Sequence, residues 1–487
     1  MVPADQGGGV MRTDLLTETV PGLDDALAAV DAFDATLVGG LLRPQPAQAA
    51  GPTELVHALA GSPLAARVAE AAEKAAAGAA SEDHLVVLAT ARSALLGSVH
   101  DALTARIQEA TGRTGGDEAD TPEPEGSGAH APNVLAAARS WLSDLARSGW
   151  QGIDHDLISG AAQIVSAMLP DPALRRLATL LDGFAAELAA SCPGATMERF
   201  PVRRWADLWS RGMLLTLPGA TGATAPTGAT APTGATGTGT ATGRLLPLGV
   251  DLQEHATAVQ AQVHAVLEPA DGATPRLVRA SVSVPKPDTI VGAGLWQLLR
   301  PHMSLLAVVS EGRSMDLTGM PVTARGDLLW SDAHARAGEP ADAFATARVV
   351  LPTAADPAVA ALERHPARIA VPVFLEGYAA GIEDGTVTFT VAGQILAVDT
   401  DRVPAAGPLT PEAVAASGAC IGLLRWDEGT YRVQPLAVET TVRKKAVTVH
   451  AGAWAGGTTD RVGVKAEKAA TDAVAVLRER AGRLLRK

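Results

Sequence analysis

Cysteine is nearly absent from this sequence, since Cys192 and Cys420 are the only two among 487 residues. Two cysteines so far apart are too few for a disulfide framework or for a cysteine-based zinc site. Long apolar runs are missing as well, because runs such as Leu305–Val309 fall far short of the roughly 18 residues that a membrane span needs. The first residues lack the basic start and apolar core of a secretory signal. These features predict a cytoplasmic protein without a membrane anchor.

Motifs for nucleotides and metals are also missing. No glycine-rich loop ends in Gly-Lys-Ser or Gly-Lys-Thr, which excludes a P-loop ATPase. The pair Gly292 and Gly294 lacks the third glycine of a dinucleotide fingerprint, because that position is Gln297. The 11 histidines are scattered, and Glu254–His255 has no second histidine at the spacing of a helical zinc motif. The sequence therefore predicts neither a cofactor nor a metal.

Charge is distributed unevenly along a chain whose net charge is −13. Residues 1–218 carry 27 acids and 15 bases, residues 244–461 carry 23 and 18, and residues 462–487 carry 3 and 7. An acidic body disfavours binding to a phosphate backbone, so the composition argues against a nucleic-acid partner. Only the C-terminal segment offers a basic contact surface.

One low-complexity segment, Gly219–Gly243, divides the chain. It repeats the hexamer Thr-Gly-Ala-Thr-Ala-Pro and contains no charged or aromatic residue. Such a segment buries too little surface to offset its ordering entropy, which predicts a flexible Thr/Gly/Ala/Pro linker. We therefore expect a helical domain at 1–218, the linker at 219–243, a β-rich domain at 244–461 and a basic amphipathic helix at 462–487. The first and third of these regions are expected to fold separately.

Helical periodicity dominates before the linker. Ser81 is placed to cap a helix from about Glu82 to Ala110, whose apolar residues follow helical spacing. The stretch Gly115–Ala131 carries five acids and no base, which predicts a disordered acidic loop. The other helices are expected at 22–40, 53–77, 134–149 with Asn133 as its cap, 154–169, 172–191 and 202–215.

After the linker the apolar period changes to two. Residues Val259–Ala265 and Val278–Val284 alternate between apolar and polar side chains, as strands do, and turn signals separate further strands downstream. Short helices are expected at 292–300, 353–364 and 410–417. The fold class is therefore a multidomain α + β protein, in which an all-helical bundle precedes a mainly antiparallel barrel or sandwich and a terminal helix.

The β-rich region also contains the candidates for an active site. Histidines and carboxylates that fall within one stretch of sequence supply an acid–base or metal-binding set, and two tryptophans are suited to line a pocket. Ordinary surface polarity explains the same residues, so an enzyme of unknown class is the alternative rather than the first hypothesis. The candidates are His302, Glu311, Asp316, Asp327 and His334, with Trp296 and Trp330.

The segment Glu198–Leu215 has the most regular amphipathic pattern. As a helix it places Trp205 and Trp209 on one face and Arg203, Arg204 and Arg211 on the other. Two interpretations are compatible: the indoles dock the helix into a core, and the arginines face a partner, since Trp and Arg dominate interface hot spots.

The string Arg-Arg-Trp-Ala-Asp-Leu-Trp at 203–209 resembles uncharacterised actinobacterial proteins encoded beside MoxR-type AAA ATPases, von Willebrand factor A proteins and SWIM zinc-finger proteins. The SWIM metal pattern of Cys-x-Cys and Cys-x-His is itself absent. The resemblance implies an accessory or client-presenting subunit of such a complex, and it identifies no catalytic residue.

The chain ends in a helix predicted at about 464–486, with a narrow apolar stripe and basic flanks that include Arg478, Arg480, Arg483 and Arg486. Such a helix is marginal alone and should dock. The acidic N-terminal domain is the expected internal site, and an acidic partner or the same helix of a second copy is the external alternative. The first hypothesis is thus a non-enzymatic scaffold or adaptor in a cytoplasmic bacterial complex. The alternatives are the enzyme with a site in the β-rich region and a regulator that uses the basic helix.

Overall fold

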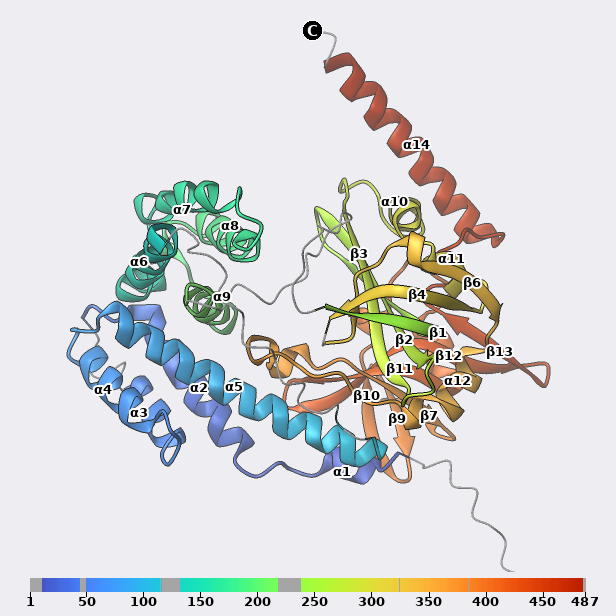
Figure 1. Ribbon diagram of the computed structural model, residues 1–487, viewed down its shortest axis with the longest axis horizontal. Coiled ribbons are helices and arrows are strands. Elements are labelled where there is room, and N and C mark those ends of the chain that lie inside the picture. The colour runs from blue at the N-terminus through green and yellow to red at the C-terminus, as the bar shows by residue number, and fades with distance from the viewer. Residues whose placement is uncertain are drawn as a thin grey trace, which may run out of the picture.

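The computed structural model describes residues 11–43, 50–113, 115, 132–217, 238–323, 325–383 and 385–484. Helices form the N-terminal part and strands dominate the C-terminal part, so the chain is a multidomain α + β protein (Figure 1). Within these ranges, the helices are too short or too polar to span a membrane.

The helical part has one continuous apolar core, to which α2 to α9 contribute. Ser81 caps α5 as predicted, because its hydroxyl accepts the His84 N–H while the His84 ring accepts the Ser81 N–H. The helices are α1 (Thr13–Thr17), α2 (Leu23–Gly39), α3 (Ala50–Ala58), α4 (Ala65–Ala76), α5 (Glu82–Thr111), α6 (Pro132–Ser148), α7 (His155–Met168), α8 (Arg175–Ala190) and α9 (Val202–Leu215).

Three helix boundaries differ from the sequence prediction. The segment 53–77 forms two helices, because Gly61 adopts a positive φ of 86° in the turn between α3 and α4. Helix α6 begins at Pro132, so Asn133 lies inside it and is not its cap. Helix α8 begins at Arg175 because the Asp171 carboxylate accepts the Ala173 N–H in a preceding turn.

The first half of the β part closes into a barrel, called barrel 1 below. β1 (Thr238–Glu254) pairs with β2 (Ala258–Pro269), and β2 pairs with β3 (Arg276–Pro285), all antiparallel. β3 runs parallel to β5 (Asp327–Leu328), and β5 pairs with β4 (Arg313–Thr323). β4 then returns to the N-terminal half of β1, which completes the order β1-β2-β3-β5-β4-β1.

The second half repeats this order as barrel 2. β7 (Val371–Glu376) and β8 (Ala379–Glu383) are consecutive, with β7 paired to β11 (Ser417–Asp427) and β8 paired to β9 (Thr386–Val391). β9 pairs with β10 (Gln394–Val398), which runs parallel to β12 (Thr430–Val442). Because β12 pairs with β11, the β7/β8 segment takes the place that β1 has in barrel 1.

The helices between strands also match in the two barrels. In barrel 1, α10 (Gly294–Leu299) and α11 (Leu305–Ser310) lie between β3 and β4 along the chain. In barrel 2, α13 (Pro411–Ala415) lies between the corresponding strands, β10 and β11. A five-stranded Greek-key barrel with this strand order and helix position has the topology of the OB-fold. The described β part thus contains two OB-like barrels in tandem, with β6 (Ala335–Pro340) added beside β4 and β13 (Lys445–His450) beside β12.

Helix α5 belongs to two cores. Its first half contributes Leu85 and Leu88 to the helical core, while Leu103 and Ile107 in its second half pack with the interior residues of barrel 2. The Tyr431 hydroxyl on β12 donates to the Leu103 carbonyl at 2.8 Å. Residues on both sides of the predicted boundary at 218 thus contribute to one apolar core.

Two further expectations are wrong. The predicted linker ends too late, because Thr238–Gly243 form the start of β1 and pair with β4, a partner that composition alone does not reveal. The helix predicted at 353–364 is replaced by the short 3-10 turns Leu351–Thr353 and Ala361–Glu363, with Pro357 between them. The remainder of the predicted linker and most of the predicted acidic loop lie outside the described residues.

Candidate functional site

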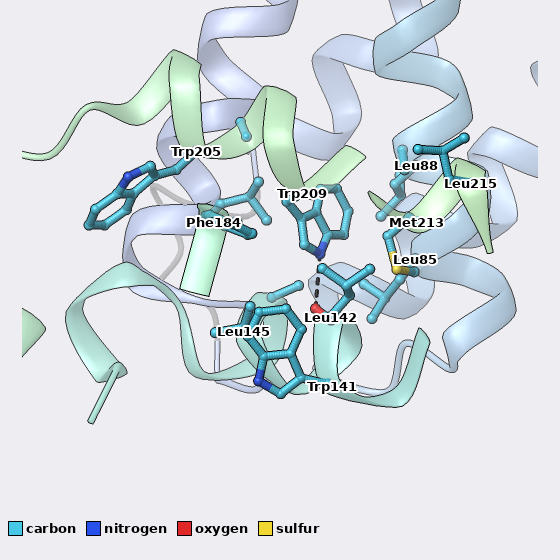
Figure 2. Close-up of a cluster of buried hydrophobic side chains, with 14 of the residues drawn as sticks. Leu85, Leu88, Trp141, Leu142, Leu145, Phe184, Trp205, Trp209, Met213 and Leu215 are labelled. Atoms are coloured by element: carbon cyan, nitrogen blue, oxygen red, sulfur yellow. Dashed lines mark hydrogen bonds between the residues drawn. The ribbon is translucent and has the colours of Figure 1, made fainter. Parts of the chain in front are cut away.

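The tryptophan face of α9 is a core face. Trp205 and Trp209 are 1% and 0% exposed, and the Trp209 indole N–H donates to the Leu142 carbonyl at 2.9 Å (Figure 2). Trp150 packs edge-on against Trp205 with ring centroids 5.7 Å apart. Trp205 and Trp209 therefore anchor α9 in the core, and their indole rings are not available to a partner.

The arginines of α9 pair within the chain. Arg203 binds Asp31 of α2 through two nitrogens, and Arg204 binds Glu187 of α8. Arg211 contacts Glu363, in the segment that connects the two barrels, at 3.1 Å. The predicted arginine face thus exists, but the described contacts of these three arginines are intramolecular.

Four of the five predicted catalytic residues have separate partners. The Nδ1 of His334 lies 2.8 Å from the Thr318 carbonyl oxygen, and His302 is exposed on a 3-10 turn after α10. The carboxylates of Glu311, Asp316 and Asp327 lie near three different arginines, Arg313, Arg336 and Arg279. Among the described residues, histidine, cysteine and carboxylate side chains form no cluster of three or more that would hold a metal.

The two tryptophans proposed as pocket walls also differ from that expectation. Trp296 is fully buried in the core of barrel 1, where its indole N–H donates to the Ala406 carbonyl at 2.6 Å. Trp330 is half-buried and donates to Asp332 at 2.8 Å. Among the described residues, a cavity of about 120 Å³ lies between α5, α12 (Ala343–Val349) and β7. None of the predicted catalytic residues lines this cavity.

The terminal helix, α14 (Arg461–Leu484), docks by its first half only. Ala466, Ala470 and Val474 pack on barrel 1 beside α10. Gly294 of α10 permits this approach, because a Cβ there would lie 2.3 Å from the Ala470 Cβ. The backbone carbonyl of Glu467 accepts from Gln297 at 2.9 Å, which fixes the helix beside α10.

The second half of α14 extends away from the barrels (Figure 1). Val476 is 45% exposed, and Arg478 and Arg480 are exposed. The exposed Arg483 pairs with Glu479 one turn earlier, at 2.5 Å. The predicted basic helix is therefore present, with three of its four predicted contact arginines on the free half and Arg486 outside the described residues.

A buried polar network joins the two barrels, and sequence reasoning missed it. Asp251 of β1 is 3% exposed and accepts from Gln253 at 2.9 Å, from Gln434 at 2.8 Å and from Arg425 at 3.0 Å. Because Gln434 and Arg425 belong to barrel 2, these bonds fix one barrel against the other. No spacing signal marks the contact between the barrels, since Arg425 lies 174 positions from Asp251 along the chain.

His264 lies beside this network on β2. Burial lowers its pKa to about 3, against the opposing charge of Asp251, so the imidazole is neutral near pH 7. Its Nε2 has no hydrogen-bond partner among the described residues. An imidazole that is buried and stays neutral down to about pH 3 is poorly suited to proton transfer near neutral pH.

Comparisons of the chain with known protein families, with curated proteins and with solved structures give no match. The class defined by the fold is thus a helical bundle joined by a shared core to two OB-like barrels, from which a basic helix projects.

Proposed function

We propose that this chain is a non-enzymatic adaptor subunit of a cytoplasmic bacterial protein complex, and that the projecting half of α14 contacts an acidic protein partner. The observation that carries this proposal is the division of α14 into a docked half and a free half. Since isolated helices of this length are marginal in water, a free basic half is best explained by an external surface that covers it.

Charge supports a protein partner that is acidic. Helix α14 carries six basic and three acidic residues, whereas residues 1–460 have a net charge of −18. Complementary potentials accelerate encounter and select partners. A second copy of the chain also presents an acidic surface, so self-association is one outcome that the experiment below has to separate.

The barrel surfaces favour the adaptor over a nucleic-acid binder. Single-stranded nucleic acids bind OB-folds by stacking bases on aromatic side chains. The second and third strands of barrel 1, β2 and β3, contain no Phe, Trp or Tyr. In the corresponding strands of barrel 2, β9 and β10, the single such residue is Phe389, which is buried and stacked on Tyr378 with ring centroids 3.9 Å apart. The dispersed partners of the predicted catalytic residues likewise favour the adaptor over the enzyme.

The resemblance of residues 203–209 suggests the class of complex. Proteins with a similar string are encoded beside MoxR-type AAA ATPases, so a complex of that kind is the partner we propose to test first. Because Trp205 and Trp209 lie in the core, the string contributes to the fold, and the contact that we propose is made by α14 instead.

The test compares the full chain with a variant that ends at Val474 and so keeps the docked half of α14. A charge-reversed variant, Arg478→Glu with Arg480→Glu and Arg483→Glu, keeps the helix length. We expect the full chain to capture an acidic host protein that both variants lose, and the purified pair to bind with an affinity that falls as salt rises.

Mass in solution and DNA binding at about 50 and 200 mM salt complete the experiment. A full chain that is dimeric only while it keeps its C-terminal residues would replace the acidic partner by a second copy. Strong, salt-sensitive DNA binding that is lost in both variants would contradict the adaptor and favour the regulator.

A further inference from the structure

The cavity beside α12 lies where three parts of the chain meet. Its volume is about 120 Å³, and its walls come from the end of α5, from α12 with the turn that follows it, and from β7 and β9. Met11 and Thr111 belong to the helical part, and Ala347 belongs to α12. Leu375 and Val391 belong to barrel 2. The cavity therefore depends on the packing of these parts against one another.

One buried cation, Arg113, lines this cavity just after α5. The residue is 6% exposed, and its Nη1 donates to the Pro372 carbonyl at 2.7 Å. Its Nη2 lies 3.2 Å from a carboxylate oxygen of Asp356 but outside hydrogen-bonding geometry, and its Nε has no hydrogen-bond partner among the described residues. Buried donors without acceptors are costly in a fold, and an acceptor inside the cavity would satisfy them.

The charges that act on the two arginines of the cavity wall indicate that this acceptor is uncharged. Asp356 acts on Arg113, and Arg348 pairs with Glu376 and Glu439, both at 2.9 Å. These five groups carry two positive and three negative charges, so together they do not attract an anion. An uncharged oxygen accepts a hydrogen bond from Arg113 without competing with Asp356 for its charge.

We propose that this cavity binds a small uncharged molecule with an apolar body and one hydrogen-bond acceptor, such as a ketone, which accepts from Arg113. The side chains of Leu351, Val373 and Leu375 give the cavity apolar walls that suit a hydrocarbon body. Water alone would satisfy Arg113 but would lie against these apolar side chains, whereas a ketone satisfies both. Since a cavity of about 150 Å³ accommodates benzene, a molecule of about six non-hydrogen atoms matches this one.

The experiment uses the full-length protein with ¹³C-labelled methionine methyl groups, because Met11 lines the cavity and reports on its contents by NMR. Three probes of similar size are titrated: cyclopentanone, cyclopentane, which lacks the acceptor, and isobutyrate, which carries a negative charge. We expect cyclopentanone to shift the Met11 signal to a saturating value, with a dissociation constant about tenfold below that of cyclopentane, because only the ketone accepts from Arg113. Isobutyrate should bind more weakly than cyclopentanone.

Matched variants assign the binding to the cavity. Ala347→Leu enlarges a buried side chain of the cavity wall and should abolish the Met11 shift. Ala345→Leu is the control, because it makes the same substitution at an exposed position of α12, and it should leave the shift unchanged. Arg113→Met combined with Asp356→Asn removes the donors without leaving a buried carboxylate unpaired. This double variant should bind cyclopentanone no more tightly than cyclopentane.

An absent or non-saturating Met11 shift with cyclopentanone would overturn the proposal, because water would then be the acceptor for Arg113. Tighter binding of isobutyrate would also overturn it, since the occupant would then be an anion. The same holds for an Ala347→Leu protein that folds and keeps the full shift, or a double variant that still prefers the ketone. The proposal does not involve α14, so its failure would leave the adaptor function untouched.

Discussion

Trp205 and Trp209 show at the residue scale how much of the helical core depends on single side chains. Both indoles are buried, and Phe33 of α2 lies 6.3 Å from the Trp209 ring. We expect Trp205→Ala and Trp209→Ala each to lower the free energy of unfolding by about 3–5 kcal/mol, because truncating a large buried aromatic leaves a cavity. Urea denaturation measures this loss.

Trp209→Phe is the control for this prediction, since it keeps an aromatic ring and removes the hydrogen bond to the Leu142 carbonyl. It should lose less stability than Trp209→Ala. Unchanged melting temperatures in both alanine variants would place the indoles on an exposed binding face after all.

The lowered pKa of a second single residue, His264, predicts that the stability of the fold depends on pH. Its folded pKa of about 3 lies below the ordinary value of 6.5, so between these values the unfolded chain binds a proton that the folded chain excludes. Stability should therefore fall as pH drops below about 6.5, by at most about 1.4 kcal/mol per pH unit from this group. Urea denaturation at pH 7 and pH 5 measures the change.

His264→Gln should reduce that decrease in stability between pH 7 and pH 5, whatever the substitution does to the free energy of unfolding at pH 7. The comparison between variant and parent matters because Asp34 acts in the opposite direction: burial raises its pKa to about 6, which favours the folded state at lower pH. An identical pH dependence in the His264→Gln protein would show that the imidazole is protonated in the fold.

Helix α5 is the element that decides how the molecule is divided. The capping pattern at Ser81 and the apolar spacing predicted its start and its end within one residue of the observed Glu82–Thr111. The same pattern did not indicate that the two halves enter different cores, since both halves present the same kinds of apolar side chain at the same spacing.

Two substitutions on α5 test this division. Leu88→Ala in the helical core and Ile107→Ala in the barrel 2 core are both at 0% exposed positions, and each should cost about 2–5 kcal/mol. Because one helix joins the cores, both should lower a single cooperative transition, seen by circular dichroism and by tryptophan fluorescence alike. Two resolved transitions, each sensitive to one variant, would show that the cores unfold independently.

The shared core has a consequence for the whole molecule. Separating residues 1–217 from 238–487 exposes Leu103 and Ile107 on one fragment and the matching interior of barrel 2 on the other. We expect each fragment alone to be unstable or aggregated, and the two to form a stable complex when produced together. Size-exclusion chromatography of separate and co-produced fragments checks this. Two fragments that each melt as the intact chain does would restore the division read from the sequence.

Local signals in the sequence predicted the elements well and the sites poorly. Alternation at 259–265 and 278–284 found β2 and β3, and the amphipathic pattern at 202–215 found α9 with its buried and charged faces. Both depend on period alone. Asp251 and Arg425, or Arg176 and Glu363, are far apart along the chain, so no periodic signal relates them.

The sequence by itself determined most of the helices and strands, the cap at Ser81, the buried face of α9 and the basic terminal helix, because each follows from interactions within a few residues. Only the tertiary structure decided that Thr238–Gly243 join a barrel, that the strands close twice in OB-like order and that α5 links two cores. It also decided which charges meet around Glu363. These features depend on pairing between distant segments, where many partners are chemically acceptable and the packing of the whole chain selects one.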